Sequence, residues 1–319
     1  MGSPRSATPP DRQILERVEQ TLRTRYWCFT AYSEQDGPAT LLQFLISRLP
    51  HISAESWAER FDFGGIYING REALSDSALP YPCRIEYYEP KFTISEASAI
   101  FPSFSDESVL FHDGYIAVVY KPPRLSSMPA KEQRHFSLKR YLDQYFNTPI
   151  HMPSRLDVSA QGLIVVSTSP EAHAGLQHAF ERRTVSKTYR FATSTVEPFE
   201  DHSVTLKIAK DPHHPVLRTA SLHDGQTAET QLAFSHHASS GEHKISVITA
   251  MPVTGRTHQI RVHAASQLMP IIGDNFYGGV FAPYLHLVSF SLSITHPVTK
   301  RFLTFELPEN RTPAWVHRR

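Results

Sequence analysis

The stretch SRLDVSAQGLIVV, residues 154–166, places an Arg-x-Asp turn directly before an unbroken apolar run. The run that begins at Leu163 lies between Gly162 and the polar segment Ser167–Pro170, which is the pattern of a buried strand in the middle of a sheet. Asp157 is therefore expected beside the entrance of this strand. A rigid element in that position can aim a carboxylate.

Four segments that carry chemically distinctive residues follow one another along the last two-thirds of the chain. They are the strand and Lys-Pro turn over 109–123, Arg155–Asp157, Lys187–Tyr189, and GRTHQIRVH at 255–263. In residues and in order they resemble the RluA-type family of RNA pseudouridine synthases. The resemblance implies a mixed, mostly antiparallel central sheet flanked by helices. It also implies an isomerase that modifies uridines in structured RNA, either ribosomal or transfer RNA.

The order of the expected elements independently favours an α+β fold. Ser169 as N-cap, Pro170 at the first helical position and Glu171 in the first turn predict a helix after the Asp157 strand. Alternating patterns then predict strands over 187–191, 203–208, 229–234 and 244–251. These elements lack the regular strand–helix alternation of a doubly wound sheet.

The composition divides the chain into four segments. Residues 1–37 form a polar arm with one expected amphipathic helix over 11–25, residues 91–108 form a polar linker, and 109–319 form the catalytic domain. Residues 38–90 predict helix, helix, strand, turn and strand, and resemble the αL RNA-binding motif of a ribosomal small-subunit protein. We therefore expect a small α/β RNA-binding module there, with a purely structural domain as the alternative.

The resemblance assigns roles to three residues of the active site. Forming pseudouridine needs a flipped-out uridine and one carboxylate, whereas glycoside hydrolysis asks for a second carboxylate and an activated water. Asp157 corresponds to that carboxylate, and Arg256 to the cation that keeps it ionised against the effect of burial. Tyr189 corresponds to an active-site tyrosine that stacks on the flipped uracil.

Four further cations are expected to contact RNA. Arg155 resembles the residue that holds the flipped nucleotide or fills its place. Arg182 and Arg183 follow the expected helix, where they either contact RNA or complement the helix dipole. Lys187 opens the Lys-x-Tyr strand.

The composition excludes several classes of protein. A formal net charge of +1 is not that of a strongly basic nucleic-acid binder, so RNA contacts must come from local patches. Two cysteines, Cys28 and Cys83, argue against a disulfide framework and for a reducing, cytoplasmic compartment. No apolar segment reaches the length of a membrane span.

The His258–His263 spacing does not match a zinc motif, and no phosphate-binding loop is present, so we expect no metal or cofactor. We also expect a monomer.

The chain departs from the family pattern at two places near Asp157. Ser154 stands where the family usually has His, and Ala160–Gln161 where it has Thr-Ser. These departures motivate an alternative, an RNA-binding or ribosome-assembly protein that keeps the fold without the activity. A metal hydrolase is a more distant alternative.

Overall fold

The computed structural model describes residues 26–32, 40–89, 104–129, 136–194, 196–212, 216–240 and 243–317. The described residues divide into two compact units. The larger combines Ser105–Arg124 with the residues that follow Thr148, and the smaller combines the residues up to Phe104 with Leu125–Asn147. The helix expected over 11–25 and the linker residues 90–103 lie outside the described residues. No helix in the described part is long and apolar enough to cross a membrane.

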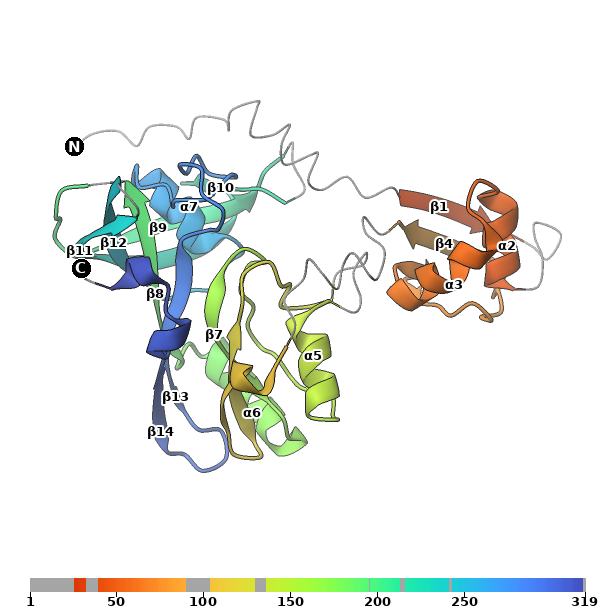
Figure 1. Ribbon diagram of the computed structural model, residues 1–319, viewed down its shortest axis with the longest axis horizontal. Helices are drawn as coiled ribbons and strands as arrows, with labels where there is room; N and C mark the ends of the chain where they lie inside the picture. Colours follow the sequence, from red (N-terminus) through yellow and green to blue (C-terminus); the bar gives the residue numbers. More distant parts are fainter. Residues whose placement is uncertain are drawn as a thin grey trace. The chain divides into compact units, whose positions relative to one another are not determined.

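The larger unit is built on one large, mostly antiparallel sheet (Figure 1). Its strand order is β10-β9-β11-β12-β8-β13-β7-β6-β5, and β14 pairs with β13. The strands are β5 (Val109–His112), β6 (Ile116–Lys121), β7 (Gln161–Ser167), β8 (Ser186–Ser194), β9 (His202–Lys210), β10 (Arg218–Ser221), β11 (Gln226–Ser240), β12 (His243–Pro252), β13 (Leu287–Thr295) and β14 (Phe302–Glu306). Among these pairs, β13–β7 is the parallel one. This is the mixed α+β architecture that the strand pattern and the resemblance predicted.

The described part of this unit also contains two α-helices and three short 3-10 helices. They are α6 (Pro170–Glu181) and α7 (Gln259–Ser266), with short 3-10 turns η2 (Asp106–Ser108), η3 (Glu309–Arg311) and η4 (Ala314–Val316). The predicted start of α6 is confirmed, because the Ser169 side chain accepts from the Glu171 N–H at 3.3 Å and Pro170 lies at the first helical position. The helix then packs on β7.

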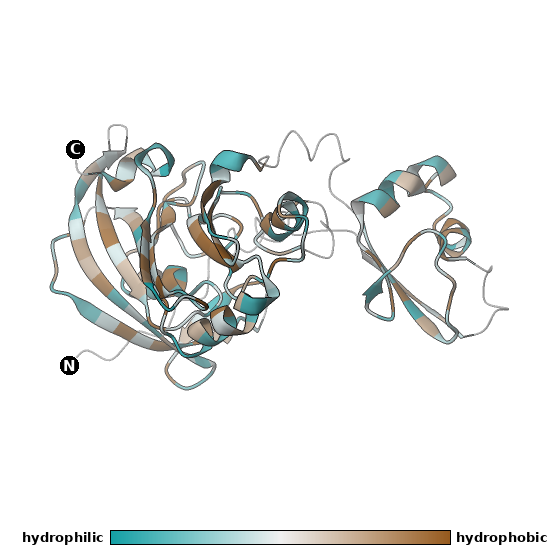
Figure 2. Cartoon of the chain, turned by 90° about the horizontal axis from the view of Figure 1, so that it is seen from below, coloured by the Kyte–Doolittle hydropathy of each residue, from teal (hydrophilic) through white to brown (hydrophobic). Residues whose placement is uncertain are grey.

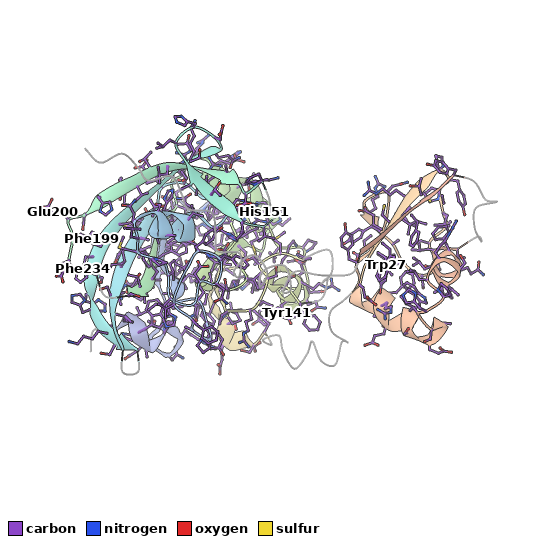
Figure 3. The ribbon with its side chains drawn as sticks, turned by 90° about the horizontal axis from the view of Figure 1, so that it is seen from above. Trp27, Tyr141, His151, Phe199, Glu200 and Phe234 are labelled. Atoms are coloured by element: carbon purple, nitrogen blue, oxygen red, sulfur yellow. The ribbon has the colours of Figure 1, made fainter. Side chains whose placement is uncertain are left out.

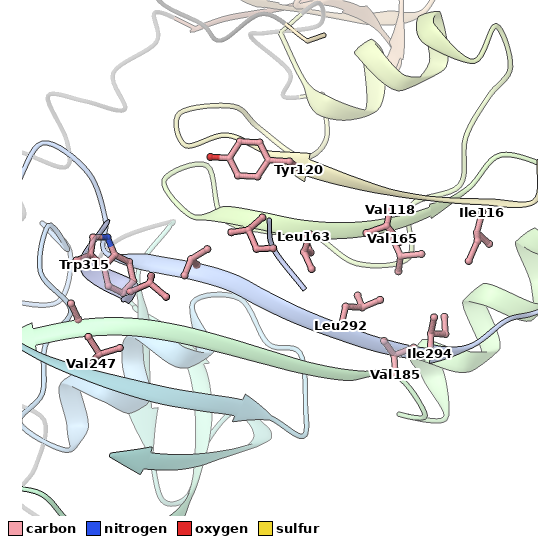
Figure 4. Close-up of a cluster of buried hydrophobic side chains, with 14 of the residues drawn as sticks. Ile116, Val118, Tyr120, Leu163, Val165, Val185, Val247, Leu292, Ile294 and Trp315 are labelled. Carbon is pink, nitrogen blue, oxygen red and sulfur yellow. The ribbon is translucent and has the colours of Figure 1, made fainter. Parts of the chain in front are cut away.

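Strand β7 is central, and every one of its residues is buried. Figure 4 shows side chains from β6, β7 and β13 meeting in one apolar cluster, to which Ile116, Leu163 and Leu292 belong. Each such side chain contributes about 1.5–3 kcal/mol relative to its exposed state. Gly162 has φ +114°, and a Cβ there would collide with the Ser289 backbone of β13. The glycine therefore allows the close approach of β7 to β13.

The hydropathy pattern agrees with this layering. In Figure 2 the inner strands carry many brown residues, whereas the helices show both brown and teal residues along their length. Helices of this kind bury one face and leave the other to solvent. The buried strand after Asp157 was therefore correctly predicted from its unbroken apolar run.

The described part of the smaller unit contains three helices and a four-stranded sheet of order β1-β4-β2-β3. Its elements are β1 (Tyr26–Ala31), α2 (Leu41–Arg48), α3 (Ala54–Phe63), β2 (Ile66–Ile68), β3 (Arg71–Glu72), β4 (Cys83–Tyr88) and, later in the chain, α5 (Leu138–Tyr145). The Ser53 side chain accepts from the Ser56 N–H at the start of α3.

Strand β1 lies within the segment that we expected to be an arm. It pairs with β4 along its whole length, and Trp27 stacks on Tyr87 with 5.3 Å between ring centroids (Figure 3 labels Trp27). The sheet of this unit therefore begins before residue 38. Pairing of β1 with a strand more than fifty residues later is a long-range contact, and local composition does not reveal it.

Candidate active site

Asp157 lies in the turn that leads into β7. The turn is closed by the Ala160 N–H, which donates to the Asp157 carbonyl at 3.1 Å. It is also tied to the end of β6, because the Lys121 ammonium donates to the Val158 carbonyl at 3.2 Å. The Asp157 side chain remains 24% exposed, which is enough for a substrate atom to reach the carboxylate.

The cation that contacts Asp157 is Arg261, in the first turn of α7. Its Nη1 lies 3.2 Å from Asp157 Oδ2. Its other two nitrogens, Nε and Nη2, donate to the two oxygens of Asp274 at 2.7 Å each. Arg261 is buried, and so is Asp274, at 1% exposed. One guanidinium therefore orients two carboxylates at once, through the fork geometry that only arginine provides.

The environment keeps Asp157 ionised. Burial acts to raise the pKa of this carboxyl, but the charge and hydrogen bond of Arg261, together with nearby cationic charge, outweigh it and hold the pKa below its ordinary value. Within the described residues, the hydrogen bond and ion pair with Arg261 and the 4.0 Å contact with the His258 ring all involve Asp157 Oδ2. The other oxygen, Oδ1, has no such contact among these residues, and the side chain as a whole is partly exposed.

Lys121 lies behind the turn and adds a positive charge there when it is protonated. Its side chain is fully buried at the end of β6, and its Nζ also donates to the Pro122 carbonyl at 2.9 Å. Burial lowers the pKa of Lys121 to about 7, and the Asp157 carboxylate opposes that effect. The ammonium both fixes the backbone beside Asp157 and favours the ionised carboxylate.

His258 and Tyr277 form a hydrogen-bonded pair beside the carboxylate. His258 Nδ1 lies 2.7 Å from the Tyr277 hydroxyl, and its Nε2 lies 4.0 Å from Asp157 Oδ2. Burial lowers the pKa of His258 to about 4, so the ring is neutral at pH 7 and acts here through hydrogen bonding. The Tyr277 hydroxyl also accepts from the Arg218 backbone N–H at 3.0 Å, which fixes its position.

Tyr189 lies on β8, opposite Ser289 of β13. Burial raises the pKa of Tyr189 to about 12, so the phenol is protonated at pH 7. The Asp157 carboxylate also acts to raise this pKa, which shows that the two side chains interact electrostatically. Because β13 also pairs with β7 at Gly162, three neighbouring strands bring Tyr189 to the Asp157 side of the sheet. The site therefore combines one accessible carboxylate, buried cations and an apolar ring with a neutral hydroxyl.

Comparison with known proteins identifies the family to which this chain belongs. A family model described as RNA pseudouridylate synthase matches residues 115–266, which include Asp157, Tyr189 and Arg261. The uncharacterized RNA pseudouridine synthase YhcT of Bacillus subtilis (strain 168) is 30% identical over 223 residues, 67% of this chain and 72% of the relative. The chain belongs to the RluA-type RNA pseudouridine synthase family. It is accordingly an RNA pseudouridine synthase, an isomerase.

Two further proteins illustrate the reach of the similarity. The dual-specificity RNA pseudouridine synthase RluA of Escherichia coli (strain K12) is 30% identical over 205 residues, 63% of this chain and 92% of the relative. The solved structure of human RNA Pseudouridylate Synthase Domain Containing 1 superposes with a TM-score of 0.56 at 21% identity, over 67% of this chain and 89% of the human one. At that identity the human structure supports the fold alone.

In this pseudouridine synthase the structure brings Asp157 and Tyr189 together but places Arg256 elsewhere. Arg256 lies in the turn before α7, where its Nε donates to the Thr227 carbonyl at 3.1 Å. The ion pair expected from Arg256 is instead made by Arg261. The reason is that α7 begins at Gln259, so the later arginine enters the buried first turn.

The expected RNA contacts differ in their surroundings. Arg155 is exposed two residues before Asp157, and Arg182 and Arg183 are exposed at the end of α6. The Lys187 ammonium lies 5.5 Å from the centroid of the Phe180 ring, and burial lowers its pKa. Its charge is therefore less available to solvent than those of the three arginines.

Five participating residues were not assigned roles from the sequence: Lys121, His258, Arg261, Asp274 and Tyr277. Some signals for them were present. Arg261 is a charged residue inside the apolar Ile260–Val262, and Lys121 ends an apolar strand. Asp274 lies between the turn-forming residues Gly273 and Gly278, and both glycines have φ near +80°. Nothing local indicated that this turn would face Arg261. The described residues contain no group of three or more potential metal-ligating side chains.

Proposed function

We propose that this synthase isomerises uridines in ribosomal or transfer RNA, and that Asp157 performs the nucleophilic step. The observation that carries the second part is the contact between Arg261 and Asp157, which holds one oxygen of an ionised carboxylate while the other stays accessible. A carboxylate in that state is suited to attack the ribose C1′ or to remove a ribose proton. Either route breaks the bond between uracil N1 and C1′.

The remaining steps need no redox partner. The detached uracil turns, C5 bonds to C1′, the hydrogen on C5 leaves to solvent, and N1 gains a proton. Tyr189 suits the middle of this sequence because its ring offers a stacking face and its raised pKa keeps the hydroxyl protonated. Stacking and exclusion of water hold the free base for rejoining.

Tritium release tests the role of Asp157 directly. RNA labelled with tritium at uridine C5 should lose label to water with the wild-type protein and keep it with Asp157→Asn. Asp201→Asn is a matched control, since Asp201 is an exposed carboxylate before β9. Normal release by the Asp157 variant would remove that residue from the mechanism.

The RNA class is tested in cells. Pseudouridine mapping in cells lacking the protein should show the loss of specific sites in ribosomal or transfer RNA. Those sites should return with the wild-type gene and not with Asp157→Asn. Losses confined to another RNA class would overturn this part of the proposal.

We further propose that the helices and sheet of residues 38–90 bind RNA, with Arg155, Arg182, Arg183 and Lys187 contacting the substrate nearer the chemistry. Arg71 and Arg84 of the small sheet are exposed. Deleting residues 1–100 should weaken RNA binding more than it slows single-turnover chemistry at saturating enzyme. The dependence of binding on salt should become shallower by about 0.7–0.9 in logarithmic slope for each phosphate that the truncated protein no longer binds.

The compartment and the assembly state belong to the same proposal. The two cysteines are free thiols, Cys28 exposed and Cys83 buried, which suits a reducing, cytoplasmic setting. We expect a monomer. Fractionation and sedimentation would test these two points.

A further inference from the structure

The loop between α7 and β13 displays large apolar side chains to solvent. Phe281 is 78% exposed, Val280 60% and Tyr284 49%. Single exposed apolar residues are common on protein surfaces, but a group of them in one short loop usually marks a contact surface. The three side chains are followed in sequence by buried Leu285 and β13.

The backbone of this loop is tightly closed. The Gly273 N–H donates to the Val280 carbonyl at 2.8 Å, and the Gly279 N–H donates to the Asp274 carbonyl at 2.9 Å. A Cβ at Gly273 would collide with the Tyr284 carbonyl, and one at Gly279 with the Ile271 carbonyl. The exposed side chains are thus presented by a backbone that needs glycine at two positions to adopt its shape.

The loop is also joined to the active site at both of its sides. Asp274, within it, holds Arg261, which in turn contacts Asp157. On the other side, the Arg124 guanidinium carbon lies 5.0 Å from the centroid of the Tyr284 ring. Arg124 follows Lys121 by three residues, a reach of at most about 11 Å.

Lys121 connects that second side to the Asp157 turn, because its ammonium bonds the Val158 carbonyl at 3.2 Å. The Tyr284–Arg124 pair is therefore linked, through three residues of chain, to the ammonium that bonds the turn of the proposed nucleophile. Arg124 is exposed, so one of its faces is open to a phosphate or a base while the other lies over the tyrosine. Arginine is suited to both tasks because its guanidinium is planar and permanently charged.

We infer that Phe281, Tyr284 and Arg124 form a stacking surface for unpaired RNA bases that flank the target uridine. The placement beside the reacting base rests on the proposed role of Asp157. Every base has a face that stacks on an aromatic ring, and a uridine that leaves its helix or loop exposes the faces of its neighbours. A protein partner is a poorer match, since a stable protein interface covers roughly 800 Å² on each side and three side chains fall short of that.

Two single-stranded probes test the stacking surface. One is a labelled oligouridylate of about 12 nucleotides, and the other is an abasic strand with the same ribose-phosphate backbone. Both carry the same phosphates, so their difference in affinity for the full-length protein measures contacts to bases. The proteins compared are wild type, Phe281→Ala, Tyr284→Ala, Tyr284→Phe and a control, Phe302→Ala.

Phe302 is a suitable control because it is 70% exposed on β14 and pairs with Thr295. Thr295 lies six residues beyond Ser289 on β13, a distance of about 20 Å along the strand. Melting curves would confirm that each variant is folded. Tyr284→Phe keeps the ring, so it separates stacking from any contact of the hydroxyl.

Wild type should bind oligouridylate more tightly than the abasic strand. Each alanine variant should lose about 5- to 150-fold in affinity for oligouridylate and little for the abasic strand. Tyr284→Phe and Phe302→Ala should retain the preference for bases. If both alanine variants retain it as well, the stacking surface is overturned.

The outcome is independent of turnover, since binding to Asp157→Asn should show the same preference. Tritium release that does not depend on Asp157, with the base preference intact, would remove only the proposed nucleophile. Asp157-dependent release, with alanine variants that bind like wild type, would remove only the stacking surface.

Discussion

The segment GRTHQIRVH contains two arginines, Arg256 and Arg261, that could form the ion pair with Asp157. Replacing Arg261 with lysine tests which of them has that role. Arg261 makes three charge-assisted bonds, two to Asp274 at 2.7 Å and one to Asp157 at 3.2 Å. A lysine keeps the positive charge but carries a single nitrogen, which cannot span both carboxylates. Arg261→Lys should therefore release one of them, and the longer bond, to Asp157, is the one expected to go.

The magnitude follows from the bond that the lysine cannot make. A hydrogen bond to a charged group contributes about 1.5–3 kcal/mol. If the transition state is destabilised by that energy, the single-turnover rate should fall by about 10- to 150-fold. The pKa of Asp157 should also rise, because the cation that opposes the effect of burial has withdrawn. Since the ionised carboxylate is the reactive form, the acid limb of the rate profile should move to higher pH.

Tritium release at saturating enzyme, measured across pH, reports both effects. The matched variant is Arg256→Lys, whose arginine bonds the Thr227 carbonyl and should leave the acid limb in place. Two results would refute the reasoning. One is a larger fall in rate in Arg256→Lys than in Arg261→Lys, and the other is an acid limb that stays where it is in Arg261→Lys.

Three further experiments test the roles of Lys121 and Tyr277 and the independence of the reaction from metal ions. Burial lowers the pKa of Lys121 to about 7, so between roughly pH 7 and 10 the unfolded chain binds a proton that the folded protein lacks. The free energy of unfolding should rise with pH in that window, by at most about 1.4 kcal/mol per unit, and Lys121→Met should flatten the rise in urea titrations. Tyr277→Phe removes the hydroxyl that bonds His258 and the Arg218 N–H, and should lower kcat about tenfold with KM unchanged in steady-state assays. Activity should survive exhaustive chelation when the RNA is folded in monovalent salt, and a loss restored specifically by zinc would contradict this expectation.

The sequence predicted best those features that depend on nearby residues. The start of α6 at Ser169–Pro170 and the buried strand after Asp157 follow from capping preferences and from an unbroken apolar run. Each is decided within a few residues of chain. The α+β class followed from the lack of regular strand–helix alternation, and the mostly antiparallel sheet followed from the resemblance.

The choice between Arg256 and Arg261 could not be made in that way. It depends on where α7 begins, and that is set by contacts with a distant strand. The Gln259 side chain donates to the Glu229 carbonyl at 2.9 Å and to the Thr230 hydroxyl at 3.0 Å, which anchors the helix start on β11. Spacing within the motif carries no information about this anchor.

The same limit applies to Asp274 and Tyr277, which follow α7 in a turn closed by glycines. Their side chains reach Arg261 and His258 only because the loop folds back over the helix. Strand β1 is a further case, since its partner β4 lies far along the chain. Long-range pairing of this kind is a property of the folded chain and leaves no local pattern.

Arg261 binds two carboxylates, those of Asp157 and Asp274. The difference between these two contacts explains how a site with two acidic residues can have only one reactive carboxylate. Asp274 is buried, with one oxygen bonded by Arg261 Nε and the other by Nη2 and by the Phe276 N–H. Both of its oxygens are engaged, so it is poorly placed to activate water, which is what an inverting glycoside hydrolase requires of its second acid. Asp157 shares the same cation but is bonded through one oxygen and is partly exposed. The guanidinium thus assigns one carboxylate to structure and leaves the other for chemistry, which matches an isomerisation better than a hydrolysis.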